Sequence, residues 1–449
     1  LNDNQMSISA TVGAFAKYFS CLTASPTYNV FRTKLKEFLN HVPSDARQVV
    51  KRLEAAIKPG MLFEEFGFRY FGPIDGHDLD LLLEMFTHVK DLSHPILVHV
   101  LTKKGKGCQI AEDDPVGFYS VSNKFNPATG QSLTAGSTTP KYTDVFSQTL
   151  VKLAKTDQRL VAITAAMPTG TGLDTFQNEY PDRFFDVGLA EQCAVTFGAG
   201  LATENLKPVI AIYSTFLQRS YDQIVHDVCI QNLPVTFALD RAGLVGADGP
   251  THHGVFDFSY LRHLPHIVIM APKDENELQS MVKTAVDYED GPVALRYPRG
   301  SGVGVPLSDQ PSTLPIGKAE VLKEGLDLLI LAIGNRVYPG LEAANVLMDI
   351  GINATVINAR FVKPLDIDLI APLAEKIGKV ITVEDHVLAG GFGSAVIEMF
   401  ADQGISAHVR RLGIPDEFVE HGDVKVLYNQ YGYDEQGIIK AGQDLLSLE

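Results

Sequence analysis

The 449-residue sequence has few cysteines and lacks any long uninterrupted apolar run. Its cysteines, Cys21, Cys108, Cys193 and Cys229, lie far apart and form no Cys-x-x-Cys pair. We therefore expect a reducing compartment, no disulfides and no zinc site. Apolar runs such as 328–333 have the length of a strand, whereas a membrane-spanning helix needs about 20 residues. A membrane partner is not expected.

Positive charge is also scarce. The chain has 38 Lys and Arg against 54 Asp and Glu, which gives a formal net charge of -16. Such a chain repels phosphate backbones and anionic lipid, so we expect no nucleic-acid partner. Hydrophobic residues at 45% and charged residues at 20% are typical of a globular protein. The sequence begins with Leu1 rather than Met, and we expect a chain in which the N-terminal part, with any targeting segment, is not visible.

From residue 60 onward, short β-rich runs alternate with amphipathic segments. This pattern is typical of an α/β protein, in which parallel sheets are covered by helices. Leu79, Leu82, Leu83 and Phe86 form an apolar stripe on one helix face, and 95–101 is expected to be the strand that follows.

Two connections rich in Gly, Pro and Ser, at 126–143 and 300–314, divide the chain. At roughly 150 residues per domain, the length predicts three domains. We place them at 1–137, 138–312 and 313–449.

The second and third domains repeat the alternation of strand and helix. Asp274 and Glu277 are spaced as a capping box, which predicts a helix start. The third domain should also contain a helix at 341–349. The strands expected in these two domains are 160–165, 208–213, 235–240, 267–271, 328–333, 354–358 and 380–383.

The turn before Glu191 is the most informative segment. A strand is expected to end by Gly188, and a helix of small residues begins near Glu191. Ligand crevices of open α/β sheets form at such carboxyl ends of strands. The same pattern also fits a carboxylate that only stabilises the helix N-terminus, with Ala194 and Gly198 allowing close packing.

Arg241, Arg296 and Arg299 follow expected strand ends. Their guanidinium groups could together bind a phosphate. Each of them also fits an ordinary surface ion pair.

Several long motifs occur together in the chain: Asp-Val-Gly-Leu-Ala-Glu191-Gln, Tyr213-Ser-Thr-Phe216-Leu-Gln-Arg219, Asp240-Arg241-Ala-Gly-Leu-Val-Gly-Ala-Asp248-Gly-Pro-Thr-His252, Arg296-Tyr-Pro-Arg299-Gly and Val383-Glu-Asp-His-Val-Leu-Ala-Gly-Gly-Phe-Gly-Ser394. In this order they resemble the 1-deoxy-D-xylulose-5-phosphate synthase family of transketolase-like thiamin diphosphate enzymes.

The resemblance implies a transketolase-like fold. The three domains would be the remainder of a diphosphate-binding domain without its Gly-Asp-Gly part, a pyrimidine-binding domain and a transketolase C-terminal-like domain. It implies a transferase that condenses pyruvate, after decarboxylation, with D-glyceraldehyde 3-phosphate, a step that feeds isoprenoid and thiamin synthesis. The resemblance also implies thiamin diphosphate and Mg²⁺ as cofactors. The protein would work as a homodimer, in a bacterial cytoplasm or a plastid stroma.

For the cofactor, the resemblance implies five residues. Glu191 would be catalytic, contacting N1′ of the aminopyrimidine and favouring its imino form. Phe216 would stack on this ring and Arg219 would border it, although Phe216 taken alone also fits a core aromatic residue. Asn4 and the carbonyl of Met6 would bind the metal ion, although this segment also fits a simple Asx turn.

For the acceptor substrate, the resemblance implies that Tyr213, Arg241 and Arg299 bind the phosphate of glyceraldehyde 3-phosphate. Asp248 and His252 would be catalytic, near the reacting carbon and the acceptor aldehyde.

Two positions depart from the family, because Cys193 and Tyr119 stand where it usually has His. A phenol is a poor proton shuttle at neutral pH, so the role of Tyr119 stays open. The alternative functions are another thiamin diphosphate enzyme, such as a transketolase or a 2-oxo acid dehydrogenase β-type subunit, or a non-catalytic truncated scaffold.

Overall fold

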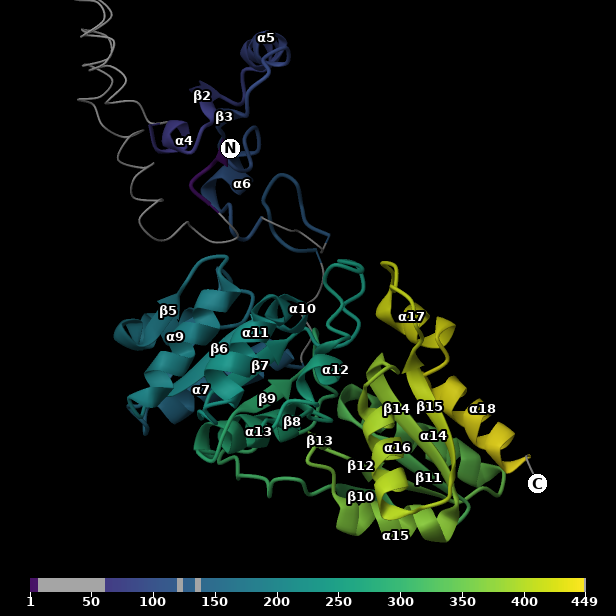
Figure 1. Ribbon diagram of the computed structural model, residues 1–449. Coiled ribbons are helices and arrows are strands. Elements are labelled where there is room, and N and C mark those ends of the chain that lie inside the picture. Colours follow the sequence, from purple (N-terminus) through teal and green to yellow (C-terminus); the bar gives the residue numbers. More distant parts are fainter. Residues whose placement is uncertain (7–60, 119–123, 134–138, 448–449) are drawn as a thin grey trace, which may run out of the picture. The chain divides into compact units, whose positions relative to one another are not determined.

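The computed structural model describes residues 1–6, 61–118, 124–133 and 139–447 (Figure 1). The chain forms two compact units, Leu1–Gly136 and Ser137–Glu449. Both contain mainly parallel sheets with helices, which confirms the predicted α/β class. None of the helices within the described ranges is long and apolar enough to span a bilayer.

The first unit contains a three-stranded parallel sheet in the order β1-β3-β2. Its elements are β1 (Asn2–Asp3), α4 (Met61–Glu65), β2 (Arg69–Asp75), α5 (Leu79–Val89), β3 (Ile96–Leu101) and α6 (Gln109–Asp113). Helix α5 begins where the Asp78 carboxylate accepts the backbone N–H of Leu81 at 3.0 Å. The predicted apolar stripe is present on this helix, but most of it is exposed, with Leu79 70% and Leu83 66% accessible.

The second unit contains a seven-stranded sheet in the order β13-β8-β9-β7-β6-β4-β5. All neighbours are parallel except β13, which pairs antiparallel with β8. The strands are β4 (Leu160–Thr164), β5 (Phe184–Asp186), β6 (Lys207–Tyr213), β7 (Thr236–Asp240), β8 (Val268–Met270), β9 (Val293–Arg296) and β13 (Phe361–Lys363). Every strand predicted in this region is therefore present, within one or two residues at each end.

Helices cover both faces of this sheet (Figure 1). Along β6, Ile210 and Ile212 pack into a core with α9, and Val209 and Ala211 pack into a second core with α7 and α13. This alternation follows from the two-residue period of a strand. The helical segments are α7 (Tyr142–Ala154), α8 (Asp174–Glu179), α9 (Glu191–Thr203), α10 (Ser214–Leu217), α11 (Tyr221–Gln223), the π-helical segment Ile224–Cys229, α12 (Asp257–Leu261) and α13 (Glu275–Asp287).

The capping box predicted for α13 is half confirmed. The Asp274 carboxylate accepts the N–H of Glu277 at 2.7 Å. The Glu277 carboxylate, however, accepts the N–H of Lys273 at 2.7 Å and also binds Arg360 at 2.7 Å. In a complete capping box, the Glu277 carboxylate would accept the N–H of Asp274. Here it accepts the N–H of Lys273 instead and also contacts Arg360, in a later part of the chain.

A five-stranded sheet follows in the order β10-β12-β11-β14-β15, with only β10 antiparallel to its neighbour. Its strands are β10 (Glu320–Lys323), β11 (Leu328–Ala332), β12 (Ala354–Asn358), β14 (Lys379–Val387) and β15 (His408–Ile414), and the helices are α14 (Val337–Asp349), α15 (Ile367–Ile377), α16 (Phe392–Gln403), α17 (Val424–Gln430) and α18 (Glu435–Leu446).

Two predicted bounds are wrong in this region. Helix α14 begins at Val337 instead of 341, because Pro339 lies in its first turn, where no helical N–H bond is lost. Strand β14 continues to Val387 instead of ending at 383. Residues 384–386 of this strand are polar and buried, which an apolar pattern cannot indicate.

Candidate active site

The carboxyl ends of four parallel strands carry the candidate residues of the second unit. Strand β5 ends at Asp186, β6 at Tyr213, β7 at Asp240 and β9 at Arg296. Since these strands are parallel neighbours in one sheet, the loops after them open at the same edge. Glu191 and Phe216 lie in the helices that follow β5 and β6, α9 and α10, whereas Arg241 and Arg299 lie in the loops after β7 and β9.

The turn that presents Glu191 is built around Asp186. One carboxylate oxygen of Asp186 accepts the N–H of Ala166 at 2.7 Å and that of Gly188 at 2.9 Å. Gly188 has a φ of 73°, which favours glycine, and α9 begins three residues later. Glu191 is only 5% exposed, and its carboxylate has no hydrogen-bond or ion-pair partner among the described residues. Neither carboxylate oxygen of Glu191 is among the described side-chain atoms that are fully buried without a partner. The carboxylate therefore keeps contact with solvent at this edge of the sheet and is open to a ligand.

An aromatic row lies beside the loop after β6. The Arg241 guanidinium lies 4.1 Å from the centroid of the Tyr213 ring, and Tyr213 stacks on Phe216 at 5.5 Å. Phe216 meets the edge of His252 at 5.5 Å. The row thus joins a residue predicted for the cofactor to residues predicted for the acceptor. Arg219 is exposed, and its proposed position beside the cofactor rests on the motif.

Arg241 and Arg299 meet at one carboxylate. Asp248 Oδ2 lies 3.2 Å from Nη1 of Arg241 and 2.6 Å from Nη1 of Arg299. Two guanidinium groups around one carboxylate leave an excess of one positive charge. All three side chains are partly accessible, so an anion of higher charge could take the place of Asp248.

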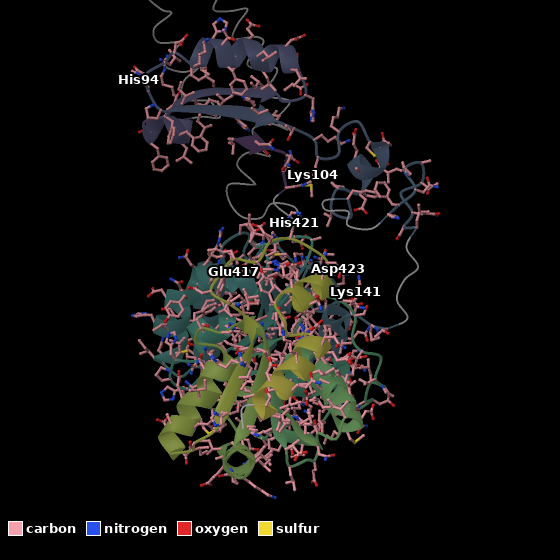
Figure 2. All side chains as sticks on the ribbon, turned by 90° about the vertical axis from the view of Figure 1, so that its right-hand side faces the viewer. His94, Lys104, Lys141, Glu417, His421 and Asp423 are labelled. Atoms are coloured by element: carbon pink, nitrogen blue, oxygen red, sulfur yellow. The ribbon has the colours of Figure 1, made fainter. Side chains whose placement is uncertain are left out.

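An open hollow of about 370 Å³ adjoins Arg299. It is lined by Arg299 together with residues 245–247 and 421–424. His421 and Asp423 lie at this end of the unit, where α17 begins (Figure 2). Residues 245–247, in the segment between β7 and α12, and residues 421–424, just before and at the start of α17, therefore line one cavity.

His252 is poised as a neutral imidazole. Burial lowers its pKa, and the neighbouring Arg241 and Arg299 add to this effect, whereas Asp248 opposes it. Its Nδ1 lies 2.9 Å from the Thr251 hydroxyl, which orients the ring. A neutral imidazole can accept or relay a proton at neutral pH.

Arg296 does not join the other two arginines, so a phosphate role for it is wrong. It is 6% exposed and its Nε lies 2.8 Å from Asp257, which is itself buried. Asp257 also accepts the hydroxyl of Ser214 at 3.0 Å. Arg296 thereby stabilises the backbone behind the site.

Asn4 and Met6 lie in the first unit. The side-chain oxygen of Asn4 accepts the N–H of Met6 at 3.0 Å, which is an Asx turn. This turn was one of the two interpretations of the sequence. The Asn4 amide oxygen keeps a second lone pair in this turn, and amide and carbonyl oxygens are among the ligands of Mg²⁺. Tyr119 lies outside the described residues.

Sequence reasoning missed two positions that shape the site. Asp186 holds the turn before Glu191, and its signal was the Asp-x-Gly spacing of an Asx turn. Gly170 lies against Tyr213, since a Cβ there would be 2.5 Å from the phenol oxygen. No local pattern indicates this contact, because 43 residues separate the partners along the chain.

Comparison with known proteins gives the family. The model described as 1-deoxy-D-xylulose-5-phosphate synthase matches residues 1–102, the transketolase pyrimidine binding domain matches 138–303, and the transketolase C-terminal domain matches 317–438. The 1-deoxy-D-xylulose-5-phosphate synthase 1 of Geobacter sulfurreducens is 54% identical over 457 aligned residues, covering 100% of this chain and 71% of the relative. The chain belongs to the 1-deoxy-D-xylulose-5-phosphate synthase family.

Further relatives agree with this assignment. The synthase of Thermomicrobium roseum is 55% identical over 98% of this chain and 70% of its own length. Among solved structures, a split-gene transketolase described as an inactive β4 tetramer is 31% identical, with a TM-score of 0.61 over 69% of this chain and 98% of that chain. A transketolase of Pichia stipitis, 18% identical with a TM-score of 0.55 over 70% of this chain and 46% of that chain, shares the fold. The transketolase-like fold predicted from the motifs is confirmed.

Proposed function

We propose that this chain contains the pyrimidine-binding and acceptor-binding part of a 1-deoxy-D-xylulose-5-phosphate synthase. The enzyme joins the two-carbon unit left from pyruvate, after loss of carbon dioxide, to D-glyceraldehyde 3-phosphate. The observation that carries the proposal is the Glu191 side chain at the carboxyl edge of the sheet, which is 5% exposed as a residue and has no hydrogen-bond or ion-pair partner in the described chain.

The proposed cofactors are thiamin diphosphate and Mg²⁺. When bound, thiamin diphosphate supplies the carbanion chemistry that decarboxylation of a 2-oxo acid requires. Glu191 would hold the aminopyrimidine through a hydrogen bond, and Phe216 and Arg219 would enclose that ring. The amide oxygen of Asn4 and the Met6 carbonyl would be two of the Mg²⁺ ligands.

The acceptor site is proposed around Asp248. A phosphate dianion would replace the Asp248 carboxylate between Arg241 and Arg299. Burial raises the pKa of Tyr213 to about 12, so its phenol keeps its proton and can donate a third hydrogen bond. The released Asp248 and the neutral His252 would then face the aldehyde, where the ring N–H of His252 would donate a hydrogen bond to its oxygen.

The test of the cofactor site is the Glu191→Gln variant of the full-length enzyme. We expect activity with pyruvate and glyceraldehyde 3-phosphate to fall by about 100-fold or more. Titration calorimetry with thiamin diphosphate and Mg²⁺ should show weaker binding. Glu204→Gln is the matched control, because Glu204 lies at the opposite end of α9 and is exposed.

Wild-type activity with xylulose 5-phosphate and ribose 5-phosphate, but none with pyruvate, would assign a transketolase instead. Absence of thiamin diphosphate binding would favour a scaffold.

We further propose domain limits at 1–137, 138–312 and 313–449, a homodimer, and a bacterial cytoplasm or plastid stroma as the location. The matched ranges 138–303 and 317–438 support the two later domains. The bacterial relatives favour the cytoplasm. Sedimentation equilibrium at micromolar concentration tests the dimer, and a monomeric mass would refute it.

A further inference from the structure

Asp385 lies in the third domain and yet contacts the acceptor loop, which we define as residues 241–253. It sits on β14 and is 1% exposed. Its carboxylate accepts the hydroxyls of Tyr428 at 2.8 Å and Tyr433 at 3.2 Å, and the side-chain amide of Asn335 at 3.0 Å. The N–H of Leu244 also points at it, at 3.2 and 3.3 Å from the two oxygens. Four donors thus fix one buried carboxylate.

The acceptor loop is shaped to reach Asp385. Gly243 has a φ of 79°, and a Cβ there would lie 2.0 Å from Oδ2 of Asp385. Gly243 and Gly254 exchange two backbone hydrogen bonds, at 2.7 and 2.9 Å, which close the loop at its base. The Asp385 contact therefore acts on a loop whose two ends are already hydrogen-bonded to each other.

A second tie runs from the loop to the same domain. The N–H of Val245 donates to Nδ1 of His253 at 3.1 Å, so the ring proton lies on Nε2, which donates to the Glu420 carbonyl at 3.3 Å. The N–H of Gly422 also reaches the carbonyl of Gly246 at 3.3 Å. The third domain thus holds the loop at Leu244, Gly246 and His253.

This placement has a direct consequence for the arginine pair. Arg241 is the first residue of the loop and Asp248 lies in its middle, whereas Arg299 comes from outside it. A shift of the backbone at Leu244 would change the spacing of the two guanidinium groups. Phosphate recognition with paired guanidinium groups depends on this spacing.

We propose that Asp385 is a positioning residue for the acceptor phosphate site: through Leu244 N–H it sets the loop that carries Arg241 and Asp248. This inference rests on the proposed function. Asp385 touches neither substrate nor cofactor, and it acts by fixing backbone. The third domain thereby contributes to recognition of the phosphorylated acceptor.

The test is the Asp385→Asn variant of the full-length enzyme, compared on glyceraldehyde 3-phosphate and on unphosphorylated D-glyceraldehyde. An amide has one oxygen acceptor where the carboxylate has two, so at least one donor loses its partner. We expect KM for glyceraldehyde 3-phosphate to rise about tenfold or more, with kcat changed less than threefold. KM for D-glyceraldehyde should change less than threefold. Calorimetric affinity for glyceraldehyde 3-phosphate should fall in parallel.

The matched control is Glu384→Gln. Glu384 is the neighbouring residue of β14 and is equally buried, but its carboxylate accepts the N–H groups of Phe392 at 2.6 Å and Gly393 at 2.8 Å, at the start of α16. In Glu384→Gln, the ratio of KM for glyceraldehyde 3-phosphate to KM for D-glyceraldehyde should stay at the wild-type level.

If Asp385→Asn does not fold, Tyr433→Phe decides the question. It removes one hydroxyl from Oδ1 of Asp385, and we expect the KM ratio to shift about threefold in the same direction. An unchanged ratio, or equal losses on both acceptors, overturns the positioning role. A wild-type enzyme without activity on pyruvate and glyceraldehyde 3-phosphate instead overturns the proposed function.

Discussion

Replacing Gly243 with alanine tests the close approach between the acceptor loop and the third domain. The new Cβ would lie 2.0 Å from Asp385 Oδ2, a distance that no pair of non-bonded atoms tolerates. Asp385 is held by two tyrosine hydroxyls, an amide and a backbone N–H, so it cannot simply rotate away. The loop, the carboxylate or both must move.

The expected loss in the free energy of unfolding has two parts. A residue with a Cβ at a φ of 79° costs about 1–2 kcal/mol. Displacing the Asp385 carboxylate from one of its donors costs about 1.5–3 kcal/mol more, because the hydrogen bond involves a charge. We expect Gly243→Ala to lower the free energy of unfolding by about 2.5–5 kcal/mol.

Gly378→Ala is the matched control, because Gly378 has a φ of 72° and nothing lies within 4 Å of its Cβ position. It should cost only the first part, about 1–2 kcal/mol. At about 2 °C per kcal/mol for a unit of this size, the apparent Tm of Gly243→Ala should lie about 3–6 °C below that of the control. Differential scanning calorimetry measures both, and equal Tm values for the two variants would refute the proposed contact.

Three further predictions concern other groups. Burial raises the pKa of Glu384 to about 8, so the native state keeps a proton that the unfolded chain releases near pH 4.5. The free energy of unfolding should therefore fall as pH rises from about 4.5 to 8, and urea midpoints at pH 5 and pH 8 should differ less in Glu384→Gln than in the wild type. Part of the slope should persist in the variant, because burial also raises the pKa of Asp240 to about 6. Asp257→Asn should cost about 3–5 kcal/mol by leaving the buried Arg296 without its charged partner, measured by urea unfolding, and a loss below about 1 kcal/mol would contradict this. Lys283→Ala should change stability by less than about 0.5 kcal/mol, because its pair with Asp287 is a partly exposed contact along one helix; a larger loss would mean that the pair is coupled to the core.

The central strands of the two larger sheets could be predicted because they are mainly apolar. Strands β4, β6, β7 and β11 are buried on both faces, so each appears in the sequence as a continuous hydrophobic run. Strand β14 was predicted too short for the opposite reason. Its last residues, Glu384 to Val387, include buried polar groups whose partners come from distant segments.

The site could be predicted only in part. Arg296 and Arg299 stand three residues apart, and nothing local separates their roles. The structure buries Arg296 against Asp257, which lies 39 residues earlier, and leaves Arg299 beside Asp248. Pairings over such separations depend on the folded backbone, so Asp385 could not be assigned from the sequence pattern either.

Strand β13 links the two sheets of the second unit. Its residues, Phe361–Lys363, follow β12 of the five-stranded sheet, yet they pair with Met270 and Ile269 at the edge of the seven-stranded one. A chimaera that joins two relatives between residues 303 and 317 would therefore bring in a foreign edge strand along with the foreign domain. Recombination after Pro364 would keep β8 with its original neighbour, whereas a chain ending near 312 would expose the β8 edge to intermolecular pairing.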